Sequence, residues 1–255
     1  MSGPPGKPLI TMARIAVAAG AAIMRHYGAA SAQTKADGSP VTAADQEAEA
    51  LILAGLAQAF PGVPVVAEEE AAAGRLAAVA DRFFLVDPLD GTREFLSGNG
   101  EFTVNIAEVR GGVPVMGVVF APARERLFLG AAGEGAFEST AALASFKPIA
   151  ARRAPADGLV AIGSRSHNDE KTAAYLKRFP VKEYVSAGSS LKFCLVAAGE
   201  ADIYPRAGRT MEWDTAAGQA VLLAAGGSVS NWDGTPFLYG KPGFENPAFV
   251  ARGLS

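Results

Sequence analysis

The strongest constraint on the fold is a change in the pattern of apolar residues midway along the chain. Before it, two helical stretches (8–30 and 43–59) precede a series of apolar runs separated by hairpin turns. After it, strands and helices alternate, a pattern that indicates an α/β layer arrangement. We therefore predict an N-terminal lobe over residues 1–150 and a C-terminal α/β lobe over 151–255.

The N-terminal half predicts helices packed on an antiparallel sheet. Thr42 is the expected cap of the second helix, and an alanine-rich helix is expected near 71–80. The expected strands of this half are 63–66, 82–86, 102–109, 113–120 and 126–131. In the C-terminal half we expect strands at 159–163, 183–186, 201–205 and 227–231, with helices at 168–178, 189–198 and 214–225.

Composition excludes several classes of function. The chain has 23 basic and 26 acidic residues, a net charge of −3, unlike the basic surface of nucleic-acid-binding proteins. Its one cysteine, Cys194, lies among apolar neighbours and permits neither an internal disulfide nor a cysteine-ligated zinc site. The two histidines, His26 and His167, are too few for a three-histidine zinc site. Carboxylates remain abundant, and they are the ligands of hard cations.

The N-terminal region has an apolar stretch at 15–24, and Ala-Ser-Ala at 30–32 imitates a signal-peptidase site. Arg25 and His26 interrupt the approach to that site, and the stretch also has the spacing of a surface helix. No segment reaches the roughly 18–20 uninterrupted apolar residues of a membrane span. We expect a cytoplasmic protein, with peripheral contact at the inner membrane and the choice between monomer and homodimer left open.

One segment carries most of the chemistry: an apolar strand runs directly into D-P-L-D-G-T at 87–92. The proline between the two aspartates restricts the backbone, so that Asp87 and Asp90 can face one side. Gly91 lets the backbone approach a ligand closely, and Thr92 begins a helix whose amides can face an anion. Two carboxylates this close repel and raise one pKa unless a cation lies between them.

Two weaker acidic elements accompany this segment. Glu68, Glu69 and Glu70 follow a short strand, and alone they are typical of a solvated helix start. Asp214, in W-D-T-A-A-G, is well placed to cap the following helix. Together the three elements place carboxylates at strand ends and helix starts in both lobes, where they could converge on a shared cleft.

The combined motifs resemble those of the inositol monophosphatase superfamily, which are magnesium-dependent, lithium-sensitive phosphomonoesterases. The resemblance includes K…S-P-V-T…D at 35–45 and covers nearly the whole chain. Within the superfamily, residues 91–106 and 188–206 look like the 3′(2′),5′-bisphosphate nucleotidase (CysQ-type) branch. The resemblance implies an α/β fold with an α+β N-terminal lobe, layered α-β-α-β-α.

The resemblance also implies two or three Mg²⁺ ions. Glu68, Asp87 and the Leu89 carbonyl would hold one ion, whereas Asp87, Asp90 and Asp214 would hold a second. Such ions neutralise a phosphate, stabilise the leaving oxygen and lower the pKa of a water molecule. The implied mechanism is in-line attack by a metal-activated water, without a phosphoenzyme.

By the same resemblance, Thr92 would orient the attacking water together with Glu68 or Asp45, and the choice between these two acids stays open. The family usually has glycine or serine before its acidic pair, whereas Ala67 stands here and Glu70 adds a third acid. The pair could be 68–69 or 69–70. We favour Glu68 as the ligand, because Ala67 then fills the small-residue position.

Substrate-binding residues are implied on both sides of the cleft: Gly91, Thr92, His167, Ser189, Lys192, Arg206 and Asp214. Ser189 and Lys192 lie three positions apart at the start of an expected helix, so they should share a face. The predicted reaction removes the 3′-phosphate of adenosine 3′,5′-bisphosphate to give AMP, with 3′-phosphoadenylyl sulfate as a second candidate substrate. The alternatives are an inositol, histidinol or fructose phosphatase of the same fold, and a non-catalytic nucleotide-binding module.

Overall fold

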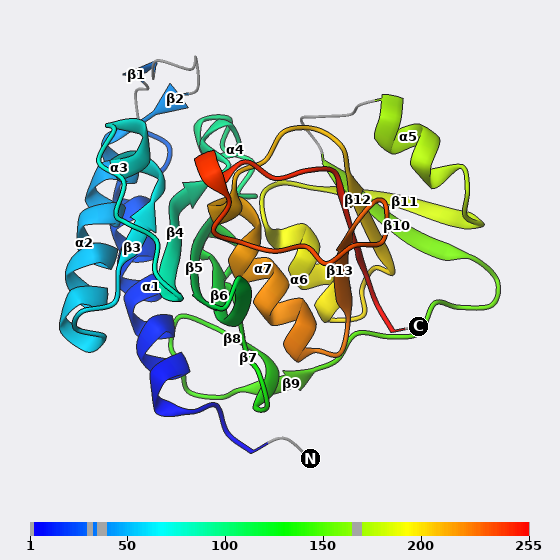
Figure 1. Cartoon of the computed structure of the whole chain (residues 1–255), viewed down its shortest axis with the longest axis horizontal. Coiled ribbons are helices and arrows are strands. Elements are labelled where there is room, and N and C mark those ends of the chain that lie inside the picture. Colours follow the sequence, from blue (N-terminus) through cyan, green and yellow to red (C-terminus); the bar gives the residue numbers. More distant parts are fainter. Residues whose placement is uncertain (1–2, 30–32, 35–39, 165–169, 255) are drawn as a thin grey trace.

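The computed structural model describes residues 3–29, 33–34, 40–164 and 170–254. Its elements stack in five layers, which Figure 1 shows from left to right. Helices α1 and α2 cover a seven-stranded sheet, α6 and α7 fill the middle layer, and a five-stranded sheet separates them from α5. The predicted α-β-α-β-α arrangement is confirmed.

The helices are α1 (Lys7–His26), α2 (Ala43–Ala59), α3 (Glu68–Ala72), α4 (Thr92–Leu96), α5 (Glu170–Leu176), α6 (Leu191–Ala197) and α7 (Glu212–Ala224). The longer helices α1, α2 and α7 are rich in alanine, whereas α3 begins with three glutamates and α4 contains no alanine. Single 3₁₀ turns occupy Pro122–Arg124 and Pro242–Phe244.

The seven-stranded sheet is the expected meander with strands added at both ends. Its order is β3 (Val65–Ala67), β4 (Arg82–Asp90), β5 (Thr103–Arg110), β6 (Val113–Ala121), β7 (Arg126–Ala131), β8 (Gly135–Ser139) and β9 (Lys147–Ile149). Only β3 and β4 are parallel, and the other neighbours are antiparallel. Strand β4 continues past its predicted end, with an irregularity between Asp87 and Asp90, which lie opposite Asn105 and Thr103 on β5.

The second sheet comes from the predicted strand–helix alternation. Its order is β11 (Val181–Ala187), β10 (Leu159–Ser164), β12 (Ile203–Arg206), β14 (Phe249–Arg252) and β13 (Ser228–Asn231). β10 is parallel to β11 and β12, while β14 runs antiparallel between β12 and β13. The sequence patterns did not predict β14. A separate pair, β1 (Gln33–Thr34) and β2 (Pro40–Val41), lies near the start of α2.

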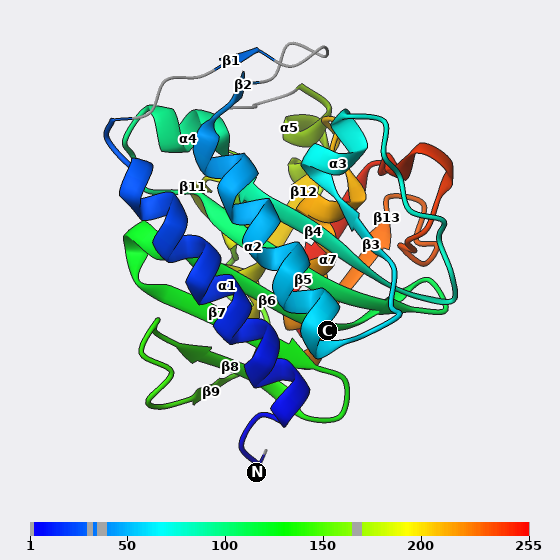
Figure 2. The same ribbon diagram turned by 90° about the vertical axis from the view of Figure 1, so that its left-hand side faces the viewer.

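Helix α2 has the predicted bounds, and its start is fixed by a reciprocal cap. The Thr42 hydroxyl accepts a hydrogen bond from the Ala44 amide (3.1 Å). The Asp45 carboxylate accepts one from the Thr42 amide (2.7 Å), which completes the capping box. Figure 2 shows α2 beside α1 across the face of the first sheet. The backbone around Asp45 is therefore rigidly placed above β4.

Helix α1 has the length and apolar composition of a membrane span. In the structure, however, it packs as a core helix against α2 and strands β5, β6 and β7. Its buried apolar residues are Leu9, Met12, Ala13, Ala16, Ala19, Ala22 and Ile23. This buried stripe accounts for the apolar character of the segment without a lipid environment.

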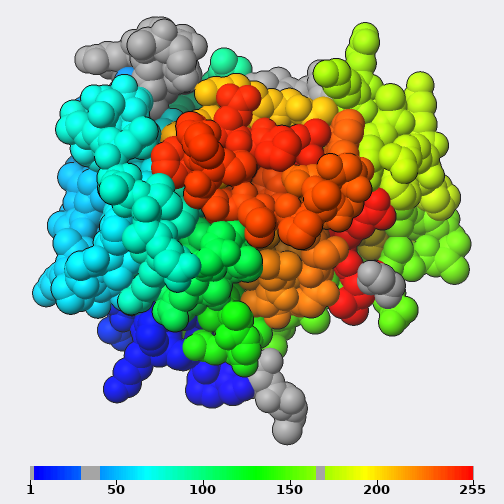
Figure 3. Space-filling view, viewed as in Figure 1, coloured from blue at the N-terminus to red at the C-terminus, as the bar shows by residue number. Residues whose placement is uncertain are grey.

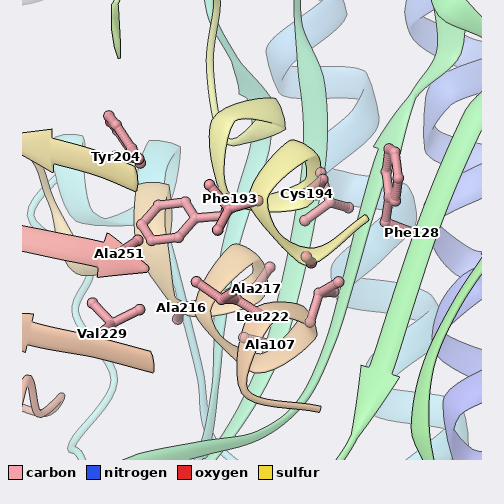
Figure 4. Close-up of a cluster of buried hydrophobic side chains, with 14 of the residues drawn as sticks. Ala107, Phe128, Phe193, Cys194, Tyr204, Ala216, Ala217, Leu222, Val229 and Ala251 are labelled. Atoms are coloured by element: carbon pink, nitrogen blue, oxygen red, sulfur yellow. The ribbon is translucent and has the colours of Figure 1, made fainter. Parts of the chain in front are cut away.

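The middle layer joins the two sheets. Phe193 and Cys194 on α6 lie next to Ala216 and Ala217 on α7, and Cys194 is fully buried as predicted (Figure 4). Helix α7 packs on strands β4 to β7 of the first sheet although it belongs to the second half of the chain. The approach is close, since a Cβ at Gly117 of β6 would lie 2.4 Å from the Ala217 carbonyl oxygen.

The helix predicted near 71–80 is wrong. Helix α3 begins at Glu68 and ends at Ala72, and the chain leaves it through Gly74 with φ +75°. The Arg75 amide donates to the Glu70 carbonyl (2.8 Å), the bond expected when a left-handed glycine ends a helix. In the space-filling view, this segment (cyan) lies beside the C-terminal loop (orange to red), where Gly240 faces Val79 (Figure 3).

Candidate active site

A cavity of about 930 Å³ lies where the two halves of the chain meet. The predicted site residues on its wall are Glu68, Asp90, Gly91, Thr92, Ser189, Lys192, Arg206 and Asp214. The wall therefore carries both acids (Glu68, Asp90 and Asp214) and cations (Lys192 and Arg206). His167 lies outside the described residues.

Asp87 is the most deeply buried acid of the site, with 1% of its surface exposed at the irregularity of β4. Burial raises the pKa of its carboxyl well above the usual value, and the charges of Glu68, Asp90 and Asp214 raise it further. Asp87 Oδ1 accepts a hydrogen bond from the Leu89 amide (3.0 Å), which fixes its orientation. The expected repulsion between the two aspartates of D-P-L-D is therefore present in the fold.

Asp90 has a more balanced environment. Burial raises the pKa of its carboxyl to about 6, although the Lys192 charge and the Ser190 amide oppose the effect. The Ser190 amide donates to Asp90 Oδ2 (2.7 Å), and the Asn105 side-chain amide lies 3.4 Å from the same oxygen. Asp90 is thus connected to the turn before α6, about a hundred positions later in the sequence.

Asp214 reaches the site from the first turn of α7. Its Oδ2 accepts a hydrogen bond from the Met211 amide (2.8 Å), so it caps the helix as expected, from within the first turn. Burial raises the pKa of Asp214 well above its usual value, and Asp90 and Glu68 raise it further. The capping role and the acidic cluster are therefore compatible.

The three adjacent glutamates have different surroundings. Glu68 lies on the cavity wall and hydrogen-bonds to Asp87, raising the pKa of that aspartate. Glu70 pairs instead with Arg75 at the surface (2.8 Å). The amides of Glu69 and Glu70 donate to Glu49 on α2. Of the three side chains, Glu68 is the one on the described wall of the cavity.

The acidic groups suit hard cations by their chemistry. The described residues include no compact group of three or more His, Cys, Asp or Glu side chains at metal-ligand spacing. The charges of Glu68, Asp90 and Asp214 nevertheless raise the pKa of Asp87, and those of Asp90 and Glu68 raise the pKa of Asp214. A divalent cation among them would relieve this repulsion and would find only oxygen donors, as Mg²⁺ prefers.

Thr92 lies between the acidic cluster and helix α2. Gly91, with φ +91°, turns the chain so that Thr92 begins α4. The Thr92 hydroxyl is 3.2 Å from Asp45 Oδ1 and 3.3 Å from the Leu89 carbonyl oxygen. Because the other oxygen of Asp45 is engaged in the α2 cap, Asp45 presents one fixed acceptor to Thr92.

The wall of the cavity also carries two buried cations. Lys192 is 4% exposed and Arg206, at the end of β12, is 9% exposed. Burial lowers the pKa of Lys192 to about 8, although Asp90 opposes this effect. Its ammonium donates to the Ser189 and Ala187 carbonyl oxygens and lies 5.4 Å from the Tyr204 ring centroid. Neither cation is a solvated surface charge.

The turn before α6 corrects one sequence prediction. Helix α6 begins at Leu191, and Ser189 precedes it with φ +44°, so Ser189 and Lys192 do not share a helix face. They meet through the backbone instead, since the Lys192 ammonium donates to the Ser189 carbonyl. The Gly188 amide donates to Glu101 Oε2 (2.9 Å), which ties the turn to the segment before β5.

The comparisons with known proteins agree with this geometry. The sequence matches the inositol monophosphatase family over residues 7–252. The chain belongs to the inositol monophosphatase family. Among curated relatives, this family member is 45% identical over 235 residues to the 3′(2′),5′-bisphosphate nucleotidase CysQ of Salmonella typhimurium, covering 91% of this chain and 94% of that protein. The Buchnera aphidicola protein of the same name is 40% identical, with 97% and 94% covered.

Solved structures of the inositol monophosphatase family have the same fold. CysQ from Bacteroides thetaiotaomicron, a bacterial member of the family, superposes with a TM-score of 0.83 at 36% identity, covering 97% of each chain. An IMPase from Thermotoga maritima gives 0.80 at 25% identity, covering 97% and 92%. Enzymes of this family are metal-dependent, which agrees with the carboxylate oxygens of Glu68, Asp87, Asp90 and Asp214.

Several functional neighbours were missed by sequence reasoning. Trp213 and Phe244, with ring centroids 6.1 Å apart, form an apolar part of the cavity wall, which also includes Arg209. Trp213 stands next to Asp214 in the motif, which is a signal that could have been used. Phe244 and Arg209 have no such signal, because a loop position becomes a wall position only through the fold.

Proposed function

We propose that this member of the inositol monophosphatase family is a 3′(2′),5′-bisphosphate nucleotidase. Its reaction would remove the 3′-phosphate of adenosine 3′,5′-bisphosphate to give AMP, and 3′-phosphoadenylyl sulfate is a second candidate substrate. The observation that carries the proposal is one cavity whose wall carries both the carboxylates Glu68, Asp90 and Asp214 and the buried cations Lys192 and Arg206. A substrate with two phosphates would use both the acids, through metal ions, and the cations. The 45% identity to CysQ nucleotidases supports this assignment.

The acidic side chains would hold two or three Mg²⁺ ions. Glu68, Asp87 and the Leu89 carbonyl would hold one, and Asp87, Asp90 and Asp214 a second, with Asp87 shared. When bound, the ions supply Lewis-acid stabilisation of the phosphoryl group and leaving oxygen and lower the pKa of the attacking water.

The hydroxyl of Thr92 would orient the attacking water. It donates to Asp45 Oδ1, so its oxygen lone pairs remain to accept a hydrogen bond from the water. Asp45 is 2% exposed and held by the α2 cap, which gives the hydroxyl one preferred orientation. Glu68 is the other acid that could assist Thr92, since it lies on the same wall as Thr92. The amides of Gly91 and Thr92 would hold the oxygens of the 3′-phosphate.

The buried cations Lys192 and Arg206 would bind the 5′-phosphate, with Ser189 and His167 near the ribose or base. A lysine whose pKa is lowered to about 8 by burial is still protonated at neutral pH, and an anion would restore its usual pKa. Each charge-assisted contact is worth roughly 1.5–3 kcal/mol, or about ten- to a hundredfold in specificity.

The test compares adenosine 3′,5′-bisphosphate, inositol 1-phosphate and fructose 1,6-bisphosphate at one Mg²⁺ concentration, with phosphate release as the readout. We expect the nucleotide to have the highest kcat/KM. Arg206→Ala should lower kcat/KM for the nucleotide about ten- to a hundredfold and barely change slow hydrolysis of inositol 1-phosphate. Arg178→Ala, at an exposed position outside the cavity, is the control.

Other outcomes would assign a different function. A preference for inositol or fructose phosphates, with no effect of Arg206→Ala, would make the chain a sugar phosphatase of the same fold. Binding of the nucleotide without phosphate release in Mg²⁺ would make it a non-catalytic module. We propose a cytoplasmic enzyme, with peripheral contact at the inner membrane as the alternative. Light scattering would measure whether it is a monomer or a homodimer.

A further inference from the structure

Helix α3, which begins at Glu68, lacks a cap of its own. The first amides of a helix have no partners within the helix, and a side chain at the preceding position usually accepts from the second and third of them. Here that position is Ala67, whose methyl group makes no such hydrogen bond. The start of α3 therefore needs an acceptor from elsewhere in the fold.

Glu49 of α2 supplies that acceptor. Its Oε2 accepts a hydrogen bond from the Glu69 amide (2.8 Å), and its Oε1 accepts one from the Glu70 amide (3.0 Å). These are the second and third amides of α3, the two that a capping side chain would satisfy. Helix α3 lies beside α2 in Figures 1 and 2, which permits this contact between helices.

The Glu49 side chain is committed to this role. The residue is 5% exposed, does not lie on the described wall of the cavity, and uses each oxygen for one amide. Burial raises the pKa of its carboxyl to about 7, while the two amide hydrogen bonds oppose that effect. A buried carboxylate is costly, so its retention needs a compensating interaction, which the two amides provide.

Glu49 also stands one helical turn after Asp45. Residues four positions apart lie on the same face of a helix. One face of α2 therefore contacts Thr92 through Asp45 Oδ1 and the start of α3 through Glu49. Both contacts lead to residues on the wall of the same cavity.

We propose that Glu49 is a positioning residue that fixes the start of α3 and, through it, the Glu68 carboxylate for binding divalent cations. This inference rests on the proposed function, in which Glu68 is a metal ligand. Partners that orient ligands are typically worth about ten- to a hundredfold in metal affinity when removed. Glu49 would act on metal affinity rather than on the chemistry at the phosphate.

The experiment measures Mn²⁺ binding to the full chain without substrate, from the electron paramagnetic resonance signal of free Mn²⁺. In Glu49→Gln, the side-chain NH₂ would face one of the two amides, so one acceptor is lost with little change in shape. We expect the dissociation constant for Mn²⁺ to rise about ten- to a hundredfold. In phosphate-release assays the Mg²⁺ requirement should rise similarly, whereas kcat at saturating Mg²⁺ should stay close to wild type.

Glu47→Gln is the matched control, because the same substitution is made two positions away on α2, where the side chain pairs with Arg25 and His26 at the surface. It should bind Mn²⁺ like the wild type. Glu68→Gln separates the two proposals. If Glu68→Gln leaves Mn²⁺ binding unchanged, the metal assignment itself fails. If Glu68→Gln weakens binding and Glu49→Gln does not, the positioning role of Glu49 is overturned.

A purely structural role for Glu49 has its own signature. Glu49→Gln would then lower the melting temperature while Mn²⁺ affinity remained that of wild type, and the proposal would be refuted. Should Glu49→Gln fail to fold, Glu49→Asp takes its place, because it keeps the charge but is one methylene too short to reach both amides. The same Mn²⁺ measurement then decides, with weakened binding supporting the proposal and unchanged binding overturning it.

Discussion

Replacing Lys192 by methionine should stabilise the protein and damage its nucleotide specificity at the same time. Lys192 is 4% exposed, and burial lowers the pKa of its ammonium from 10.5 to about 8 against the attraction of Asp90. Methionine has a similar length, carries no charge, and can keep the contact with the Tyr204 ring. The variant therefore removes a charge that the folded protein holds at a cost.

The magnitude follows from that pKa. A lowering from 10.5 to about 8 corresponds to about 3 kcal/mol of unfavourable free energy at neutral pH. The ammonium also donates to the Ala187 and Ser189 carbonyl oxygens, and losing these two bonds removes about 1–2 kcal/mol. The free energy of unfolding of Lys192→Met should therefore exceed that of wild type by about 1–2 kcal/mol at pH 7.

The pH dependence of this difference has a defined sign. The folded-state pKa of Lys192 lies below the unfolded value, so the cost is fully present below about pH 8 and disappears as the pH rises towards 10.5. The stability of wild type should therefore rise relative to that of Lys192→Met between these values. Urea unfolding in EDTA at several pH values measures the difference, and Lys177→Met, at an exposed position directly after α5, is the control.

Activity should change in the opposite direction to stability. For adenosine 3′,5′-bisphosphate, kcat/KM of Lys192→Met should fall about ten- to a hundredfold, with little change for inositol 1-phosphate. A variant that is less stable than wild type at pH 7, with a difference that does not depend on pH, would refute the reasoning about the buried charge. Equal losses on both substrates would refute the role in binding the second phosphate.

Three other outcomes test the site. Asp87→Asn should reduce turnover at least about a hundredfold in phosphate-release assays, because it removes the shared metal charge, yet raise the melting temperature of metal-free protein by relieving repulsion; wild-type rates at saturating Mg²⁺ would contradict the two-metal assignment. Lithium, by resemblance to the family, and calcium, which prefers more and longer oxygen contacts, should each slow phosphate release at millimolar concentration; rates unaffected by either ion would exclude the proposed site. Gly188→Ala should lower the free energy of unfolding by about 1–3 kcal/mol in urea, since its Cβ would lie 2.5 Å from the Glu101 carbonyl oxygen; an unchanged stability would show that this turn can move away.

Local rules predicted the parts of the fold whose determinants lie close together in the sequence. The bounds of α2 follow from Thr42 and Asp45, which cap the helix within its first turn. The end of α3 had a similar local signal in Gly74, whose left-handed conformation stops the helix. The predicted helix at 71–80 relied on alanine content and overlooked that glycine. The helix propensity of alanine is therefore a weaker signal than a glycine that can end the helix.

The start of α3 could not be predicted in the same way. Ala67 offers no cap, and the acceptor comes from Glu49 on another helix. Strand β14 was missed for a related reason, since its place between β12 and β13 depends on pairing with segments distant in the sequence. In both cases the deciding interaction joins two distant segments, whereas hydrophobic periodicity is read within one short segment at a time.

The same distinction between local and distant determinants applies to the residues of the candidate site. The aspartates of D-P-L-D-G-T could be chosen from the sequence because the motif places them on one strand end. Their partners could not, because Ser190 donates to Asp90 across a separation of 100 positions. The burial of Lys192 likewise comes from the packing of α6 in the assembled fold.

The turn 187–190 contacts both an acid and a cation of the cavity wall. The Ser190 amide donates to Asp90, while the Lys192 ammonium donates to the Ser189 carbonyl. Gly188 has no room for a side chain against Glu101, so the turn cannot shift without moving both contacts. Because Asp90 and Lys192 each stabilise the other's charge, an anion that binds Lys192 competes for part of that interaction. A bisphosphate that brings anionic groups to Lys192 and metal ions to Asp90 would satisfy both charges together, which a monophosphate cannot do.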